Sequence, residues 1–148
     1  MEVQPDFKEL LALFNEHHVS YLIVGGYALA FHGAPRFTGD LDIYVKPDRD
    51  NAQRIVAALD VFGFASLGLK AGDFDQPDQV IQLGVSPVRI DLITSITGVS
   101  WDAALAGRVP SIYGDVPVHY IGREQLVLNK RATGRKRDLA DLEALGEK

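Results

Sequence analysis

The sequence has 148 residues, a formal net charge of −5, 47% hydrophobic and 24% charged residues, and no cysteine. A chain of this size is expected to form a single domain that spans residues 1–148. The absence of cysteine excludes disulfides, thiolate metal sites and cysteine nucleophiles, and it favours a cytoplasmic location. No apolar run approaches the length of a membrane span, so no membrane partner is expected, and the acidic charge argues against nonspecific coating of nucleic acid.

The first half of the sequence alternates between helix and strand patterns. Apolar residues three and four positions apart predict helices, whereas short apolar or alternating runs predict strands. The expected elements are a helix at 5–17, a strand at Tyr21–Val24 ended by a Gly-Gly pair, a short helix at 27–32, a strand at 41–45, and a helix that begins at Pro47-Asp48 and carries an apolar stripe to Phe62.

The second half begins with a loop and a hairpin pattern and ends with helix patterns. We expect a loop at 68–78, strands at 79–85 and 88–93 joined at Ser86-Pro87, a helix at 100–106, one or two strands within 109–121, and helices at 123–131 and 137–145 broken at Gly134. Strands that alternate with helices, followed by a hairpin, predict an α/β (α+β) fold. The expected architecture is a central mixed β-sheet flanked by helices, with two closing C-terminal helices.

Three aspartates stand in strand-like runs, where an unpaired charge is unfavourable. Asp40 and Asp42 share one face of the 41–45 strand pattern, with Cβ atoms roughly 6–7 Å apart. Asp91 lies between apolar residues in a second strand pattern and would join them if the two strands are neighbours. Carboxylates so grouped suit Mg²⁺. The structural alternatives are that Asp40 belongs to a turn and that Asp91 pairs with Arg89 or another basic residue.

The motifs together carry a family resemblance. Val24-Gly25-Gly26, a gap of 13 residues, Asp40-Leu41-Asp42-Ile43 and the later Asp91 resemble the signature of the nucleotidyltransferase superfamily typified by DNA polymerase β. Arg36-Phe37-Thr38-Gly39 and the terminal Lys130…Arg137-Asp138…Asp141 resemble small bacterial members, namely minimal nucleotidyltransferases and AbiEii-type toxins.

The resemblance implies a nucleotidyltransferase fold and a two-metal displacement on a nucleoside triphosphate such as ATP. Two Mg²⁺ ions, replaceable by Mn²⁺, would be held by carboxylates, and one carboxylate would receive the acceptor proton. Glycine amides at a helix start suit phosphate oxygens. The expected roles are catalysis and metal binding for Asp40, Asp42 and Asp91, with Asp91 receiving the proton, and nucleotide binding for Gly25, Gly26, Arg36, Thr38, Lys130 and Arg137.

The acceptor stays open between two enzyme hypotheses and one non-catalytic one. Transfer to a tRNA or protein hydroxyl, as in the toxin of a toxin–antitoxin pair, fits the basic segment 129–137 with its five positive charges. Transfer to a small molecule of aminoglycoside type fits the acidic residues of the 68–78 loop. The third hypothesis is a nucleotide-binding relative without activity. An antitoxin, a helical partner chain or a homodimer is expected to complete the site, and Asp138 and Asp141 are expected on the polar face of the last helix.

Overall fold

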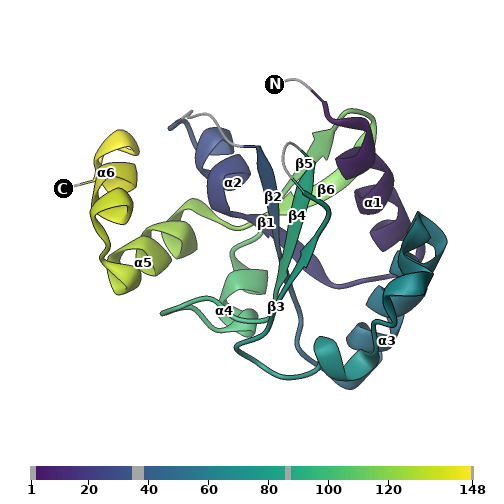
Figure 1. Cartoon of the computed structure of the whole chain (residues 1–148). Helices are drawn as coiled ribbons and strands as arrows, with labels where there is room; N and C mark the ends of the chain where they lie inside the picture. The colour runs from purple at the N-terminus through teal and green to yellow at the C-terminus, as the bar shows by residue number, and fades with distance from the viewer. Residues whose placement is uncertain (1–2, 35–38, 86–87, 148) are drawn as a thin grey trace.

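A computed structural model describes residues 3–34, 39–85 and 88–147, and within them the chain forms a six-stranded mixed sheet with helices packed around it (Figure 1). The strand order is β3-β4-β2-β1-β6-β5. The strands are β1 (Tyr21–Val24), β2 (Asp40–Val45), β3 (Val80–Leu83), β4 (Arg89–Ile93), β5 (Val109–Tyr113) and β6 (Val116–Tyr120). The helices are α1 (Pro5–Glu16), α2 (Gly25–Phe31), α3 (Arg49–Leu59), α4 (Trp101–Ala106), α5 (Arg123–Thr133) and α6 (Lys136–Ala144).

The central strands β1, β2 and β4 place the candidate site. β2 runs antiparallel to β1 and parallel to β4, so it has a neighbour on each side. Its odd-numbered residues Leu41, Ile43 and Val45 are fully buried in the core. The alternation of side chains along a strand therefore leaves Asp40 and Asp42 on the opposite face of the sheet. Figure 1 shows α1 and α3 on one side of the sheet and α2 and α4 on the other.

The mixed sheet with flanking helices confirms the expected fold class, and the strands of the predicted hairpin, β3 and β4, pair antiparallel. The 109–121 segment, expected to hold one or two strands, forms the antiparallel pair β5 and β6. The joint at Ser86-Pro87 lies outside the described residues. Helix α2 begins at Gly25, two residues earlier than expected, so the Gly-Gly pair is the first turn of the helix as well as the end of the strand.

Two expectations about irregular segments were wrong. The 68–78 loop contains a short 3₁₀ helix, Ala71–Asp73, in which Asp73 accepts a hydrogen bond from the backbone N–H of Lys70. Helix α3 ends at Leu59, and the next turn of the chain, Asp60–Phe64, is kinked. The kink is at Gly63, because its φ of 118° is one that an α-helix does not allow. Phe62 still packs against the core, but from this turn.

The closing helices α5 and α6 form a hairpin at one end of the molecule (Figure 1). Gly134 ends α5 with a φ of 61°, the left-handed conformation typical of a glycine after a helix. Of the helices in ranges 3–34, 39–85 and 88–147, not one has the length and apolar character needed to cross a membrane.

Candidate active site

The structure brings the three predicted aspartates together on neighbouring strands. In the parallel pair β2–β4, Asp42 lies directly opposite Asp91, and Asp40 lies directly opposite Arg89. Asp91 is buried, with 8% of the residue exposed, whereas the side chain of Asp40 is about one-third exposed. The pairing of β2 with β4 that the sequence hypothesis required is therefore present.

Arg89 lies among these carboxylates and pairs with two of them. Its Nε donates to Asp91 Oδ1 at 3.1 Å and its Nη2 donates to Asp91 Oδ2 at 2.9 Å, which is a two-pronged contact. The same Nη2 lies 3.7 Å from Asp40 Oδ2. The alternative in which Asp91 pairs with Arg89 is thus also correct, and in the ligand-free protein the cluster already holds one positive charge.

Asp42 is the carboxylate whose ionisation is most perturbed. Burial, then repulsion from Asp91 and a hydrogen bond to it, and then repulsion from Asp40 raise the pKa of Asp42 to about 7. Arg89 opposes this rise but does not cancel it. A carboxyl group whose pKa is raised by burial and by neighbouring like charges is one whose ionised form a cation would stabilise.

The side chains as they stand do not form a ready-made metal site. Within 3–34, 39–85 and 88–147, no group of three or more His, Cys, Asp or Glu side chains is positioned to hold a metal ion. The donor set nevertheless fits a hard divalent cation, because its oxygens are carboxylate oxygens and their charge exceeds that of Arg89. The raised pKa of Asp42 is the structural sign of this unbalanced charge.

Gly25 lies beside Asp42 and has no room for a side chain. Val24, the last residue of β1, lies opposite Asp42, and Gly25 follows with a φ of 67°. A Cβ atom on Gly25 would lie 2.9 Å from the Cβ of Asp42 and would overlap its carboxylate oxygen. The first turn of α2, whose backbone N–H groups have no partner within the helix, therefore begins next to the carboxylates.

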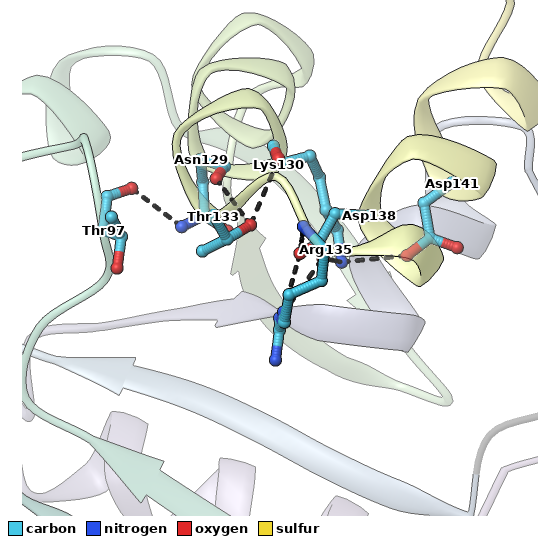
Figure 2. Close-up of polar contacts among 7 residues, drawn as sticks. All are labelled: Thr97, Asn129, Lys130, Thr133, Arg135, Asp138 and Asp141. Carbon is cyan, nitrogen blue, oxygen red and sulfur yellow. Dashed lines mark hydrogen bonds and ion pairs between the residues drawn. The ribbon is translucent and has the colours of Figure 1, made fainter.

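Lys130 lies in a separate charge cluster between α5 and α6 (Figure 2). Its Nζ is 3.0 Å from Asp141 Oδ2 and 3.5 Å from Asp138 Oδ1. Arg135 Nε also donates to Asp138 Oδ2, at 2.7 Å. Burial alone would raise the pKa of Asp138, but the hydrogen bonds from Arg135 and Thr133 and the charge of Lys130 lower it well below its usual range.

This cluster corrects the expectation that Asp138 and Asp141 lie on a solvated face. Asp138 is fully buried and Asp141 is 4% exposed, so both are part of the contact between the two helices. Of the five positive charges in segment 129–137, Lys130 and Arg135 pair with these aspartates and Arg131 pairs with Glu147. Lys136 and Arg137 are exposed.

The remaining candidates are Arg36, Thr38 and the acidic residues of the 68–78 loop. Arg36 and Thr38 lie outside the described residues, so their position relative to Asp40 is not described. The loop acids assigned to a cationic acceptor serve local structure: Asp75 pairs with Arg49 at 3.2 Å, and Asp78 Oδ1 accepts from Ser95 Oγ at 2.9 Å.

One positioning residue was missed by the sequence reasoning. Asn51 is 1% exposed and joins the start of β1 to the end of β2. Its Oδ1 accepts from Ser20 N at 2.7 Å, and its Nδ2 donates to Ser20 O and Lys46 O, each at 3.0 Å. The sequence shows only an Asn three residues after the N-cap Asp48, and no local pattern marks it as buried, so its need for several partners appears only in the structure.

Comparisons with known proteins identify the fold. A scan against protein-family models finds no match, and neither does a search of curated proteins. Solved structures do match: the Thermotoga maritima protein TM1012, a proposed nucleotidyltransferase, has a TM-score of 0.62 at 12% identity, with 96% of this chain and 93% of that chain covered.

An antibiotic adenylyltransferase and an antibiotic-resistance factor are also similar. The lincomycin-bound lincosamide adenylyltransferase LnuA has a TM-score of 0.56 at 15% identity and covers 97% of this chain and 96% of its own. The antibiotic-resistance factor ANT(2'')-Ia has a TM-score of 0.58 at 12% identity, and the match covers 95% of this chain and 80% of that chain. The chain has the nucleotidyltransferase fold, which confirms the resemblance inferred from the sequence at the level of the fold.

Proposed function

We propose that the protein is a Mg²⁺-dependent nucleotidyltransferase that moves a nucleoside monophosphate from an NTP to a hydroxyl group and releases pyrophosphate. The observation that carries the proposal is the convergence of Asp40, Asp42 and Asp91 on one face of β2 and β4, beside the Gly25-Gly26 turn. Carboxylates and open backbone amides next to each other are what a metal–triphosphate complex requires.

Each residue has a role in this proposal. Asp40, Asp42 and Asp91 would hold the divalent ions, Mg²⁺ or Mn²⁺, which would supply charge neutralisation and activation of the acceptor hydroxyl. Asp91 would accept the proton as that oxygen bonds to the α-phosphorus and the bond to pyrophosphate breaks. The N–H groups of Gly25 and Gly26 would bind phosphate oxygens.

Four further residues are proposed as nucleotide ligands from the family resemblance. Lys130 would have to exchange its present partners to reach a phosphate, because Asp141 and Asp138 hold it now. Arg137 is exposed and needs no such exchange. Arg36 and Thr38 are likewise proposed to bind the nucleotide. A cytoplasmic location, where NTPs are available, belongs to the same proposal.

For the acceptor, we propose a hydroxyl of a tRNA or of a protein, with a toxin role in a toxin–antitoxin pair. The support is the exposed pair Lys136 and Arg137 on α6, although three of the five basic residues in the segment are neutralised internally. An antitoxin, a helical chain or a second copy would contact the same hairpin, where Leu128 and Leu139 are 47% and 56% exposed.

A small-molecule acceptor is the second candidate, and one comparison favours it. The match to LnuA, an antibiotic adenylyltransferase, covers 97% of this chain and 96% of the LnuA chain. A chain with this fold and extent can therefore act on a small molecule without an added large helical domain.

The test is transfer of label from each α-³²P-labelled NTP in the presence of Mg²⁺, with tRNA, cell lysate or an aminoglycoside and lincosamide panel as acceptors. Wild type would be compared with Asp42→Asn and with Asp102→Asn, an exposed aspartate on α4 that serves as the control. We expect label transfer by wild type and by Asp102→Asn and its loss in Asp42→Asn. Transfer that survives Asp42→Asn, or NTP binding with no transfer to any acceptor, would contradict the proposal.

A further inference from the structure

We propose that Arg89 is an internal counter-cation that competes with divalent metal ions for the aspartate cluster and so sets the metal concentration that the site needs. This inference rests on the proposed function, since it concerns the same carboxylates. It starts from one geometric fact: both oxygens of Asp91 are hydrogen-bonded to one guanidinium, at 3.1 Å and 2.9 Å.

The position of Arg89 follows from the strand. Arg89 and Asp91 are two residues apart on β4 and so lie on the same face, and Arg89 lies opposite Asp40 in the pairing with β2. From there its Nη2 reaches Asp91 at 2.9 Å and Asp40 at 3.7 Å. The guanidinium thus spans two of the three carboxylates that a metal ion would use.

The two cations cannot use Asp91 in the same way at the same time. An ion bound by Asp91 needs lone pairs of a carboxylate whose two oxygens both accept from Arg89, so at least one of these hydrogen bonds must open. Arginine stays protonated at any working pH, so it leaves by moving and not by losing its charge. Its side chain is 33% exposed, which leaves a solvent-facing side toward which it can move.

The purely structural reading makes the opposite prediction. If Arg89 only stabilises the start of β4, its removal makes the position of the Asp91 side chain less fixed and weakens metal binding. If Arg89 competes with the metal, its removal takes a positive charge away from Asp40 and Asp91 and leaves the cluster with more unbalanced negative charge, so metal binding becomes tighter.

The experiment is a Mn²⁺ titration of the NTP-free full-length protein, with free Mn²⁺ measured by electron paramagnetic resonance. The variants are Arg89→Gln, Arg89→Lys and Asp42→Asn. Arg49→Gln is the matched control, because it removes the same charge from an exposed pair with Asp75. We expect Arg89→Gln to lower the Mn²⁺ dissociation constant by about tenfold, the equivalent of one pKa unit of charge interaction.

The other variants complete the pattern. Arg89→Lys keeps the positive charge but loses the two-pronged hydrogen bond, so its Mn²⁺ dissociation constant should lie between those of wild type and Arg89→Gln. Arg49→Gln should have the dissociation constant of wild type, and Asp42→Asn should no longer bind Mn²⁺. The midpoint of thermal unfolding supplies a second readout: without metal it should fall in Arg89→Gln, and Mn²⁺ should raise it more than in wild type.

Two outcomes would overturn the inference, and they can be told apart. Mn²⁺ binding that depends on Asp42 but is unchanged or weaker in folded Arg89→Gln and Arg89→Lys would reject the competition and leave the proposed function standing. The absence of Asp42-dependent Mn²⁺ binding in every variant would reject both the competition and the metal site of the proposed function.

Discussion

Asp42 and Asp91 are cross-strand partners in the parallel pair β2–β4, and burial together with this proximity raises the pKa of Asp42 to about 7. Two carboxylates that face each other at the centre of a sheet oppose folding, because burial and like charge both disfavour their ionised forms. The chain keeps this unfavourable pair beside a glycine turn, at a place where a bound cation would offset the repulsion.

The first prediction concerns the stability cost of Asp42. Unfolded Asp42 loses its proton near pH 4, whereas folded Asp42 keeps it to about pH 7, so the folded state binds more protons in between. The contribution of this group to stability therefore falls as pH rises through that window. In EDTA at pH 8, Asp42→Asn should be more stable than wild type by up to about 4 kcal/mol, the equivalent of about three pKa units, with a Tm several degrees higher and the gain vanishing near pH 4.

Thermal unfolding across this pH range is the measurement, and Asp102→Asn is the control. Asp102 is exposed, so its replacement should leave the Tm unchanged at each pH. A lower Tm for Asp42→Asn at pH 8 would show that the ionised carboxylate stabilises the metal-free fold.

The second prediction concerns Gly25. Gly25→Ala adds both a left-handed strain of about 1 kcal/mol and an overlap with the carboxylate of Asp42. Gly68→Ala is the matched control, because Gly68 has a φ of 68° and nothing within 4 Å of its added Cβ. Urea unfolding should show a larger loss for Gly25→Ala, and Mn²⁺ affinity should fall only in that variant. Equal losses in both would mean that the close approach to Asp42 has no effect.

The third prediction concerns the cluster between α5 and α6. Asp138→Asn removes the charge of a fully buried carboxylate that pairs with both Lys130 and Arg135, which should cost about 3 kcal/mol at pH 7. Because the pKa of folded Asp138 is lowered, its stabilising effect is complete above the ordinary aspartate pKa near 4 and declines as pH falls below it.

Urea unfolding at pH 7 and at pH 3 tests this prediction, with Asp115→Asn as the control. Asp115 pairs with Lys8 at 2.9 Å but its side chain is 80% exposed, so its replacement should change the free energy of unfolding little. The difference between wild type and Asp138→Asn should shrink at the lower pH, and a difference that grows there would be inconsistent with a lowered pKa.

The fourth prediction concerns Asn51. Asn51→Ala removes three buried hydrogen bonds that join the start of β1 to the end of β2, and should cost about 2–3 kcal/mol. Asn129→Ala, which loses one exposed bond to Thr97 O, should cost under about 1 kcal/mol in the same chemical unfolding assay. A small effect at Asn51 would mean that water replaces the lost amide.

The sequence predicted most of the site because its signals are local. The alternation of 40–45 fixed which side of the strand Asp40 and Asp42 occupy, and the apolar flanks of Asp91 marked a buried strand. The pairing of β2 with β4 was the one long-range assumption, and the structure has it, with Asp42 opposite Asp91.

Other features depend on contacts that no local pattern carries. Asp138 and Asp141 have the spacing of a solvated helix face, and only the return of α6 onto α5 buries them against Lys130. The position of β6 beside β1, in parallel, likewise depends on where a distant strand is added to the sheet.

That parallel pair has a consequence for synthesis of the chain. Ile23 of β1 pairs with Tyr120 of β6, whereas β2 follows β1 closely in sequence. During translation one edge of β1 therefore stays open until β6 has left the ribosome, even though β2 can already cover the other edge. A nascent chain that stalls before β6 thus exposes the unpaired edge of β1, a central strand of the finished sheet, to its neighbours.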